Sequence, residues 1–137
     1  MSSAVVSLHM RHDLLRAWLS VHTGETLYVA LTRTVAVANA TGAQLDEPVG
    51  AGYARAAYPI DAEHFELADT AELRSTAEVI FPAAEEGGWG FCQGYALCTD
   101  STSGMTWSVG RLTSPTPVPE GMVIGIPAGA IAIGLED

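Results

Sequence analysis

After residue 24, short apolar runs separated by turn-forming residues recur about every ten positions along the chain. β-Branched and aromatic residues fill runs such as TLYVALTRTVAV and FCQGYALC, whereas Gly, Pro, Asn, Asp and Ser fill the intervals. Strands of this length and spacing are typical of antiparallel sandwiches and barrels. We therefore predict an all-β fold, an antiparallel β-sandwich of the jelly-roll or Ig-like kind, over residues 26–135.

Residues 3–22 have a different pattern, with neither Gly nor Pro. A stripe with three- and four-residue steps predicts one amphipathic N-terminal α-helix, and it comprises Val5, Leu8, His12, Leu15 and Leu19. A second set of apolar residues widens this stripe, namely Val6, Met10, Leu14 and Trp18. We expect Ser2 or Ser3 to cap the start of the helix and Gly24 to follow its end.

Length and composition indicate one packed domain over residues 1–137. A chain of 137 residues is close to the size at which one hydrophobic core is efficient, since domains are commonly about 100–150 residues long. With 48% hydrophobic and only 16% charged residues, the composition is far from that of disordered chains. Global disorder is excluded.

Several segments can be assigned from local signals. Residues 39–52 predict a long loop, and residues 91–110 form the clearest hairpin, closed by the turn STSG. Residues 61–78 fit either an acidic helix or two short strands, and we favour strands. The run TSPTPVPEG predicts an extended, hydrogen-bond-poor connector, followed by one or two apolar strands in residues 122–135.

The charge balance excludes several classes of partner. Sixteen acidic residues against six basic ones give a net charge of −10, which repels phosphate backbones and anionic lipids. We therefore expect neither nucleic acid nor a membrane as a partner. The apolar residues 122–135 are too short and too interrupted to span a bilayer, which takes about 20 residues. No secretory signal is visible, so synthesis in a cytoplasm is expected.

The two cysteines are expected to be free and buried. If FCQGYALC is one strand, six residues at about 3.3 Å each separate Cys92 from Cys98 by about 20 Å. A disulfide requires Cα atoms within roughly 7 Å of each other.

No set of residues predicts catalysis, a cofactor or a metal. The sequence has no GxSxG, HExxH, GxxxxGK[ST] or strand-borne GxGxxG motif. His9 and His12 could bind a metal with Cys92 or an acid, and the acids of residues 61–78 could bind a cation, but polar solvated surfaces are the favoured interpretation. An aromatic platform for sugars, with Trp89 and Trp107, is the alternative function, although packing of these rings is favoured.

Six motifs in a fixed order resemble the small virion proteins of tailed bacteriophages described as tail-fibre or minor tail proteins. They are LYVALTRT, the loop QLDEPVGAGYAR, the strand VIFP, the turn at Trp89 and Gly90, the hairpin YALCTDSTSG, and the C-terminal PAGAIAIGL. The resemblance extends from about residue 3 to the C-terminus.

This resemblance implies a structural virion protein on the tail or outer capsid, made in the host cytoplasm, without catalytic residues. It implies contacts with other capsid or tail proteins and with copies of itself, a trimer being favoured. High apolar content, the lack of lysine and an apolar C-terminal strand also favour self-association. The helix, the GYAR segment and the C-terminal strand are the candidate inter-subunit surfaces. The candidate contact residues are Leu15, Leu19, Tyr53, Arg55, Trp107, Ile131 and Ile133.

Overall fold

The structure is a computed structural model that describes residues 6–135. Its internal contacts divide the chain into two compact units. Unit 1 comprises Met1–Glu25, Pro59–Glu78 and Pro127–Asp137, and unit 2 comprises Thr26–Tyr58 and Val79–Ile126. A single domain over residues 1–137 stays a prediction.

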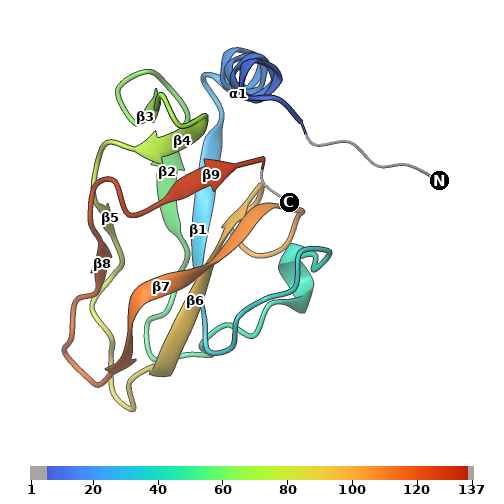
Figure 1. Cartoon of the computed structure of the whole chain (residues 1–137). Coiled ribbons are helices and arrows are strands. Elements are labelled where there is room, and N and C mark those ends of the chain that lie inside the picture. Colours follow the sequence, from blue (N-terminus) through green and yellow to red (C-terminus); the bar gives the residue numbers. More distant parts are fainter. Residues whose placement is uncertain (1–5, 136–137) are drawn as a thin grey trace. The chain divides into compact units, whose positions relative to one another are not determined.

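Unit 2 is built on a four-stranded sheet in the order β2-β1-β6-β7 (Figure 1). Its strands are β1 (Thr26–Thr32), β2 (Ala56–Pro59), β6 (Gly90–Cys98) and β7 (Thr106–Val118). β6 pairs antiparallel with β1, where Tyr28 lies opposite Cys98, and also with β7. The predicted hairpin is therefore confirmed as β6 and β7. A separate antiparallel pair joins β5 (Val79–Ile80) to β8 (Gly125–Ile126).

The central strands β1 and β6 are buried on both faces, which explains why their sequences are almost continuously apolar. Alternate residues such as Val29 and Leu31 are fully buried, and so is Leu97 on β6. On the opposite face Ala30, Ala96 and Cys98 form a second buried cluster. Cys92 and Cys98 lie on β6, buried and free, as predicted.

The proline-containing run after Leu112 is extended, but it is not a connector. Residues 113–118 belong to β7, and Thr116, Pro117 and Val118 lie opposite Cys92, Phe91 and Gly90 of β6. β7 is an edge strand of its sheet. Proline is tolerated on an edge because its missing N–H can face away from the ladder. The prediction of a hydrogen-bond-poor connector is therefore wrong for residues 116–118, whereas residues 112–115 lie where the register shifts between Cys92 and Gly94.

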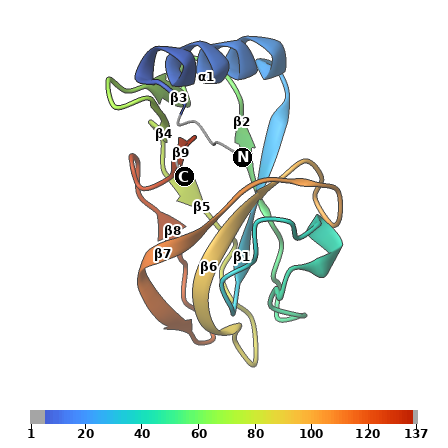
Figure 2. The ribbon, with the colours of Figure 1, turned by 45° about the vertical axis from the view of Figure 1, so that its right-hand side comes forward.

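Unit 1 contains the helix α1 (Leu8–His22) and a three-stranded antiparallel sheet in the order β3-β4-β9. These strands are β3 (Phe65–Leu67), β4 (Glu72–Ser75) and β9 (Ala132–Gly134). The strand interpretation of residues 61–78 is thus confirmed over β3 and β4. Two short strands, β8 and β9, occur in residues 122–135, also as predicted. Figure 2 shows α1 lengthwise, beside β3.

The helix begins later than predicted. Ser7 is its N-cap, with its side-chain oxygen accepting a hydrogen bond from the Met10 N–H at 3.2 Å. Residues 6 and 7 are therefore not helical, whereas residues 3–5, including Val5 and the caps proposed at Ser2 or Ser3, lie outside the described residues. The helix ends at His22 as predicted, and Gly24 follows with φ of +99°.

The prediction of which helix face is buried is wrong in part. Leu15 is buried at 4% exposure, but Met10 and Leu14 of the second set are 51% and 45% exposed, and Leu8, the first helical residue on the Leu15 side, is 54% exposed. A three- and four-residue spacing is compatible with two neighbouring faces of one helix, and the packing against β3 and β4 selects the Leu15 face. Even so, the all-β class, with antiparallel sheets and one N-terminal α-helix, is confirmed.

Candidate functional site

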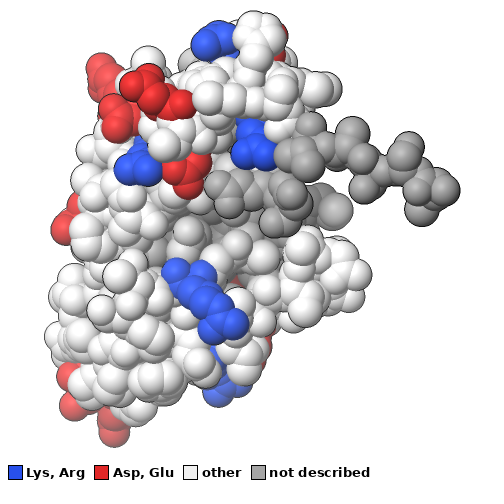
Figure 3. Space-filling model, in the orientation of Figure 1, with Lys and Arg blue, Asp and Glu red and all other residues white. Residues whose placement is uncertain are grey.

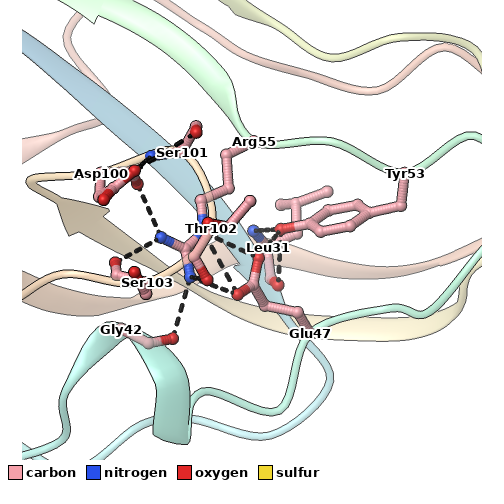
Figure 4. Close-up of polar contacts among 9 residues, drawn as sticks. All are labelled: Leu31, Gly42, Glu47, Tyr53, Arg55, Asp100, Ser101, Thr102 and Ser103. Atoms are coloured by element: carbon pink, nitrogen blue, oxygen red, sulfur yellow. Dashed lines mark hydrogen bonds and ion pairs between the residues drawn. The ribbon is translucent and has the colours of Figure 1, made fainter.

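Arg55 lies in the chain segment just before β2, and its side chain is only 2% exposed. Its guanidinium forms an ion pair with the Glu47 carboxylate, with Nη2 2.6 Å from Oε1 (Figure 4). The Nε of Arg55 donates to the same carboxylate at 3.1 and 3.2 Å. A planar guanidinium can bind a carboxylate through two hydrogen bonds at once, which a lysine ammonium does less well.

The remaining donors of Arg55 reach carbonyl oxygens of two other segments. Nη1 donates to the carbonyl oxygens of Asp100 and Ser103 at 2.8 and 2.9 Å. Nη2 donates to the carbonyl oxygen of Gly42 at 2.9 Å and of Thr102 at 3.3 Å. One buried side chain therefore joins the 42–47 loop, the segment before β2 and the β6–β7 turn. Burial alone lowers the pKa of Arg55, but the hydrogen bond and charge of Glu47 outweigh it and raise the pKa overall.

Tyr53 is the second side chain that forms a hydrogen bond with Glu47. Its hydroxyl donates to Glu47 Oε2 at 2.5 Å and accepts from the backbone N–H of Leu31 on β1 at 3.1 Å. Burial, followed by the hydrogen bond and charge of Glu47, raises the pKa of Tyr53. Tyr53 therefore remains a neutral phenol and anchors the loop to the sheet.

The β6–β7 turn is shaped by short-range contacts in DSTSG. Asp100 accepts a hydrogen bond from the Ser101 N–H at 2.6 Å, and Gly104 adopts φ of +80°, which favours glycine. The turn is tied to the facing loop because the Gly42 N–H donates to the Gly104 carbonyl oxygen at 2.8 Å. Thr106 Oγ1 also donates to the Ala40 carbonyl oxygen at 2.8 Å. We call residues 37–55 and 99–107 together the loop end of unit 2.

A hollow of about 450 Å³ opens at the loop end, lined by Tyr53, Arg55, Glu47 and the turn residues Ser101 and Thr102. Its charged groups are already paired with each other, and its lining has neither a histidine nor a cysteine. The arrangement can hold two loops in fixed positions. It does not place a base beside a nucleophile, as covalent catalysis requires.

Metal-binding groups do not gather elsewhere in the part of the chain that the structure describes. Within residues 6–135 no three His, Cys, Asp or Glu side chains are grouped so that they could hold a metal ion. The acids of residues 61–78 instead pair locally, as Asp61 does with His64 and Glu72 with Arg74. Burial raises the pKa of both Cys92 and Cys98, which disfavours the reactive thiolate.

The seven predicted contact residues fall into two groups. Three are buried inside their own units, namely Leu15, Arg55 and Ile131. Four retain exposed surface, namely Leu19, Tyr53, Trp107 and Ile133, of which Trp107 is 43% exposed. The structure brings Tyr53 and Arg55 together around Glu47, and Trp107 is the second residue of β7, on the other segment of the loop end. Contact with other subunits stays a prediction, and exposed side chains are the ones available for it.

Trp89 is buried at 3% exposure, so it is unsuited to stack on a sugar. Its ring packs edge-on against Tyr53, with centroids 5.2 Å apart, and its indole N–H donates to the Ala51 carbonyl oxygen at 2.9 Å. The predicted preference for packing therefore describes Trp89 correctly.

Sequence reasoning missed Glu47, Val37 and Met105. Glu47 follows Asp46 in a loop where acids are normally solvated, so its pairing with Arg55, eight residues later, left no periodic signal. Met105 is an apolar residue in a polar turn and Val37 ends the run TLYVALTRTVAV; they are 62% and 65% exposed. An apolar residue inside or beside a predicted turn, such as Met105, is the sequence signal that could have indicated an exposed apolar side chain.

Comparison with known proteins gives one finding on the family. A family model described as Gp80, podophage GP4 fiber I protein gp80, matches residues 7–134. No protein with a curated description matches the chain. In the described residues, no helix is both long enough and apolar enough to cross a membrane.

Proposed function

The chain belongs to the podophage GP4 fiber I protein gp80 family, and from this membership we propose that it is a fibre subunit which binds a neighbouring virion protein through the loop end of unit 2. Membership makes it a structural protein of a tailed-phage virion. The proposal places it on the tail, as a homo-oligomer with a trimer favoured, and assigns it no enzymatic activity.

The Arg55 contacts are the observation that supports this proposal. The guanidinium of Arg55 donates hydrogen bonds to Glu47 and to carbonyl oxygens of its own chain, so it orders the loops around it. Loops held in this way can meet a partner without first losing conformational freedom, which makes binding more favourable. The ordered segments carry four exposed apolar side chains, Val37, Val49, Met105 and Trp107.

Aromatic residues and methionine are enriched at protein interfaces, and Trp is the residue that most often dominates binding energy. A contact centred on Trp107 and Met105 fits a protein partner with an apolar pocket. Asp100, which is exposed at the same end, would favour a basic residue in the rim of that pocket.

Incorporation into virions tests the proposal. Phage lacking the gene would be complemented with wild-type protein or with Met105→Ser/Trp107→Ala, and purified particles would be assayed by immunoblot. We expect incorporation to fall at least tenfold. The matched control is Ile80→Ser/Phe91→Ala, which removes two apolar side chains that are 60% and 49% exposed outside the loop end. Wild-type incorporation of the Trp107 variant would refute the loop end as the docking surface.

Position on the particle needs a separate experiment. Immunogold labelling of intact particles should decorate the tail or its tip, and labelling spread over the head would refute the tail assignment in favour of capsid decoration. Trp107 is the exposed ring left for the alternative sugar-binding function. Glycan-array binding that is lost in Trp107→Ala would support that alternative, and a blank array would remove it.

A further inference from the structure

The exposed side of α1 carries a second apolar stripe, which we call the α1 seam. It consists of Met10, Leu14, Ala17 and Val21, all of them exposed, with Val21 exposed by 72%. At about 100° per residue these four positions fall within about 60° of the helix circumference. The buried Leu15 lies outside this arc, on the side that packs in unit 1 against β3 and β4. α1 therefore has two apolar faces, one of which is used within the unit.

We infer that copies of this chain associate through the α1 seam, packing α1 against α1. This inference rests on the proposed fibre role, for which it supplies the contact between subunits. The seam residues are spaced by four, three and four positions. That is the spacing at which two helices interlock side chains in a coiled-coil manner. The partner of such a seam is another helix, and a second copy supplies one with the same spacing.

The side chains and charges at the seam suit a second copy. Ala17 is small, so two helices can approach closely at the middle of the seam, with Leu14 and Val21 on either side. One border of the seam carries Asp13 and the other Arg11, so two parallel copies would place an acidic border along a basic one.

The low acid content of α1 also favours contact at this place. The whole chain carries a net charge of −10, which opposes the approach of two copies over most of the molecule. Leu8–His22 contains one acidic residue, Asp13, and two arginines. α1 itself therefore adds no net negative charge to such a contact.

The size of the seam limits the strength of this association. A helix of 15 residues is only about 22 Å long at 1.5 Å per residue. A seam of four side chains buries much less than the roughly 1,200 Å² of a stable interface. We therefore expect an association that depends on concentration in solution and becomes complete when copies are held together in a fibre.

Sedimentation equilibrium of the full chain over a wide concentration range tests the inference. We expect the mass of the wild-type protein to rise from 14.3 kDa towards that of a dimer or trimer. Leu14→Gln/Val21→Gln should weaken this association at least tenfold. Glutamine leaves the net charge unchanged and retains helix propensity, so an intact helical circular dichroism signal is expected. The matched control, His9→Gln/Ser20→Gln, changes exposed positions of the same helix outside the seam.

Disulfide trapping gives a second measurement. The sequence contains no lysine for amine-reactive cross-linkers, and Cys92 and Cys98 are fully buried, so introduced thiols on α1 would be the reactive ones. Leu14→Cys/Ala17→Cys covers both parallel and antiparallel packing and should form covalent oligomers on mild oxidation. His9→Cys/Ser20→Cys should form far fewer.

Three results would overturn the inference: a wild-type mass that stays at 14.3 kDa, a glutamine seam variant that associates like the wild type, or equal trapping of the two cysteine pairs. None of these affects the loop-end proposal, which virion incorporation tests. Conversely, a Met105→Ser/Trp107→Ala protein could self-associate normally and yet fail to enter particles. That result would support both proposals.

Discussion

Arg55 is the residue that holds the loop end of unit 2 together. With 2% of its side chain exposed and the Glu47 carboxylate 17% exposed, the pair is largely removed from water. A buried pair is not a large net source of stability, but the loss of one partner leaves the other charge buried and uncompensated. In addition, four carbonyl oxygens lose the donor that holds their segments together.

Arg55→Met should therefore destabilise the protein by about 3 kcal/mol, as is typical when a buried ion pair loses one partner. Urea unfolding followed by tryptophan fluorescence would measure this. The matched control is Arg33→Met, which breaks the pair between Arg33 and Asp46, 2.8 Å apart and 49% and 38% exposed. That change should cost less than about 1 kcal/mol. Equal losses would mean that Arg55 contributes no more than a surface charge.

The ionisation of Asp61 should make the stability of the protein depend on pH. The hydrogen bond from His64, 2.7 Å away, lowers the pKa of Asp61, and backbone N–H groups of Glu63 and His64 add to the effect. Because the folded state favours the carboxylate, this stabilisation is present above the unfolded pKa of about 3.9 and is lost as pH falls towards the lowered folded value.

Thermal melts at a series of pH values would show this effect. We expect Asp61→Asn to be less stable than the wild type at pH 7, and the difference to shrink as the pH falls below about 4, because the wild-type carboxyl is then protonated as well. A pH-independent difference would mean that the Asp61 charge is not involved.

The importance of Arg55 was predictable from the sequence, but its role was not. A lone arginine in the otherwise apolar and small GYARAAY segment stands out, and an inter-subunit contact was the predicted reason. Its true partners are Glu47 and four carbonyl groups, up to 48 residues away. Carbonyl acceptors occur at every residue, so no sequence pattern identifies them.

At the scale of elements, the loop end depends on the close approach of the 3₁₀ turn Gly42–Gln44 to the β6–β7 turn. A Cβ at position 42 would lie 2.1 Å from the Ser103 carbonyl oxygen and 2.6 Å from its carbon. Both are backbone atoms and cannot rotate away. Glycine is therefore required at this position for space.

Gly42→Ala should push the two turns apart and destabilise the protein by about 1–3 kcal/mol, the usual range for overpacking. Faster hydrogen exchange of the Gly42 N–H, which donates to the Gly104 carbonyl oxygen, would locate the change at the loop end. The neighbouring exposed Ala43 provides the control, since Ala43→Ser should stay within about 0.5 kcal/mol of the wild type. A Gly42→Ala protein as stable as this control would contradict the close approach.

Elements with strong local signals were the predictable ones. The hairpin of β6 and β7 follows from its alternating β-branched and aromatic residues, and the turn near Trp89 from Gly87, Gly88 and Gly90, all of which adopt positive φ. The pairing of residues 116–118 with β6 was not predictable, because a proline indicates extended backbone but not whether the strand has a neighbour. The face of α1 that is buried depends in the same way on β3 and β4, which come much later in the chain.

At the scale of the whole molecule, charge is distributed unevenly between the two units. Unit 1 contains ten acidic residues against three arginines, whereas unit 2 contains six against three. Figure 3 shows red side chains gathered on the side of unit 1 where β3 and β4 lie. The net charge of −7 in unit 1 comes mainly from residues 61–78, whereas α1 in the same unit contains one acidic residue and two arginines.

The path of the chain bears on how the molecule unfolds. Unit 1 is assembled from three separate segments, so the chain passes from one unit to the other after Glu25, Tyr58, Glu78 and Ile126. Neither unit is a continuous piece of sequence. β2 includes Pro59, which is the first residue of a unit 1 segment. β1 starts at Thr26, directly after Glu25, the last residue of another unit 1 segment. At both places the chain passes between the units at the end of a strand. Unfolding of one unit therefore removes the fixed chain ends on which the other depends.

We accordingly expect one cooperative thermal transition, as the single-domain prediction requires. Scanning calorimetry should give a calorimetric enthalpy equal to the van't Hoff enthalpy, near 95 kcal/mol at about 0.7 kcal/mol for each of the 137 residues. Measurement at low protein concentration keeps self-association from adding to the heat. Two resolved transitions, or a calorimetric enthalpy about twice the van't Hoff value, would show that the two units unfold independently, and would replace one domain by two.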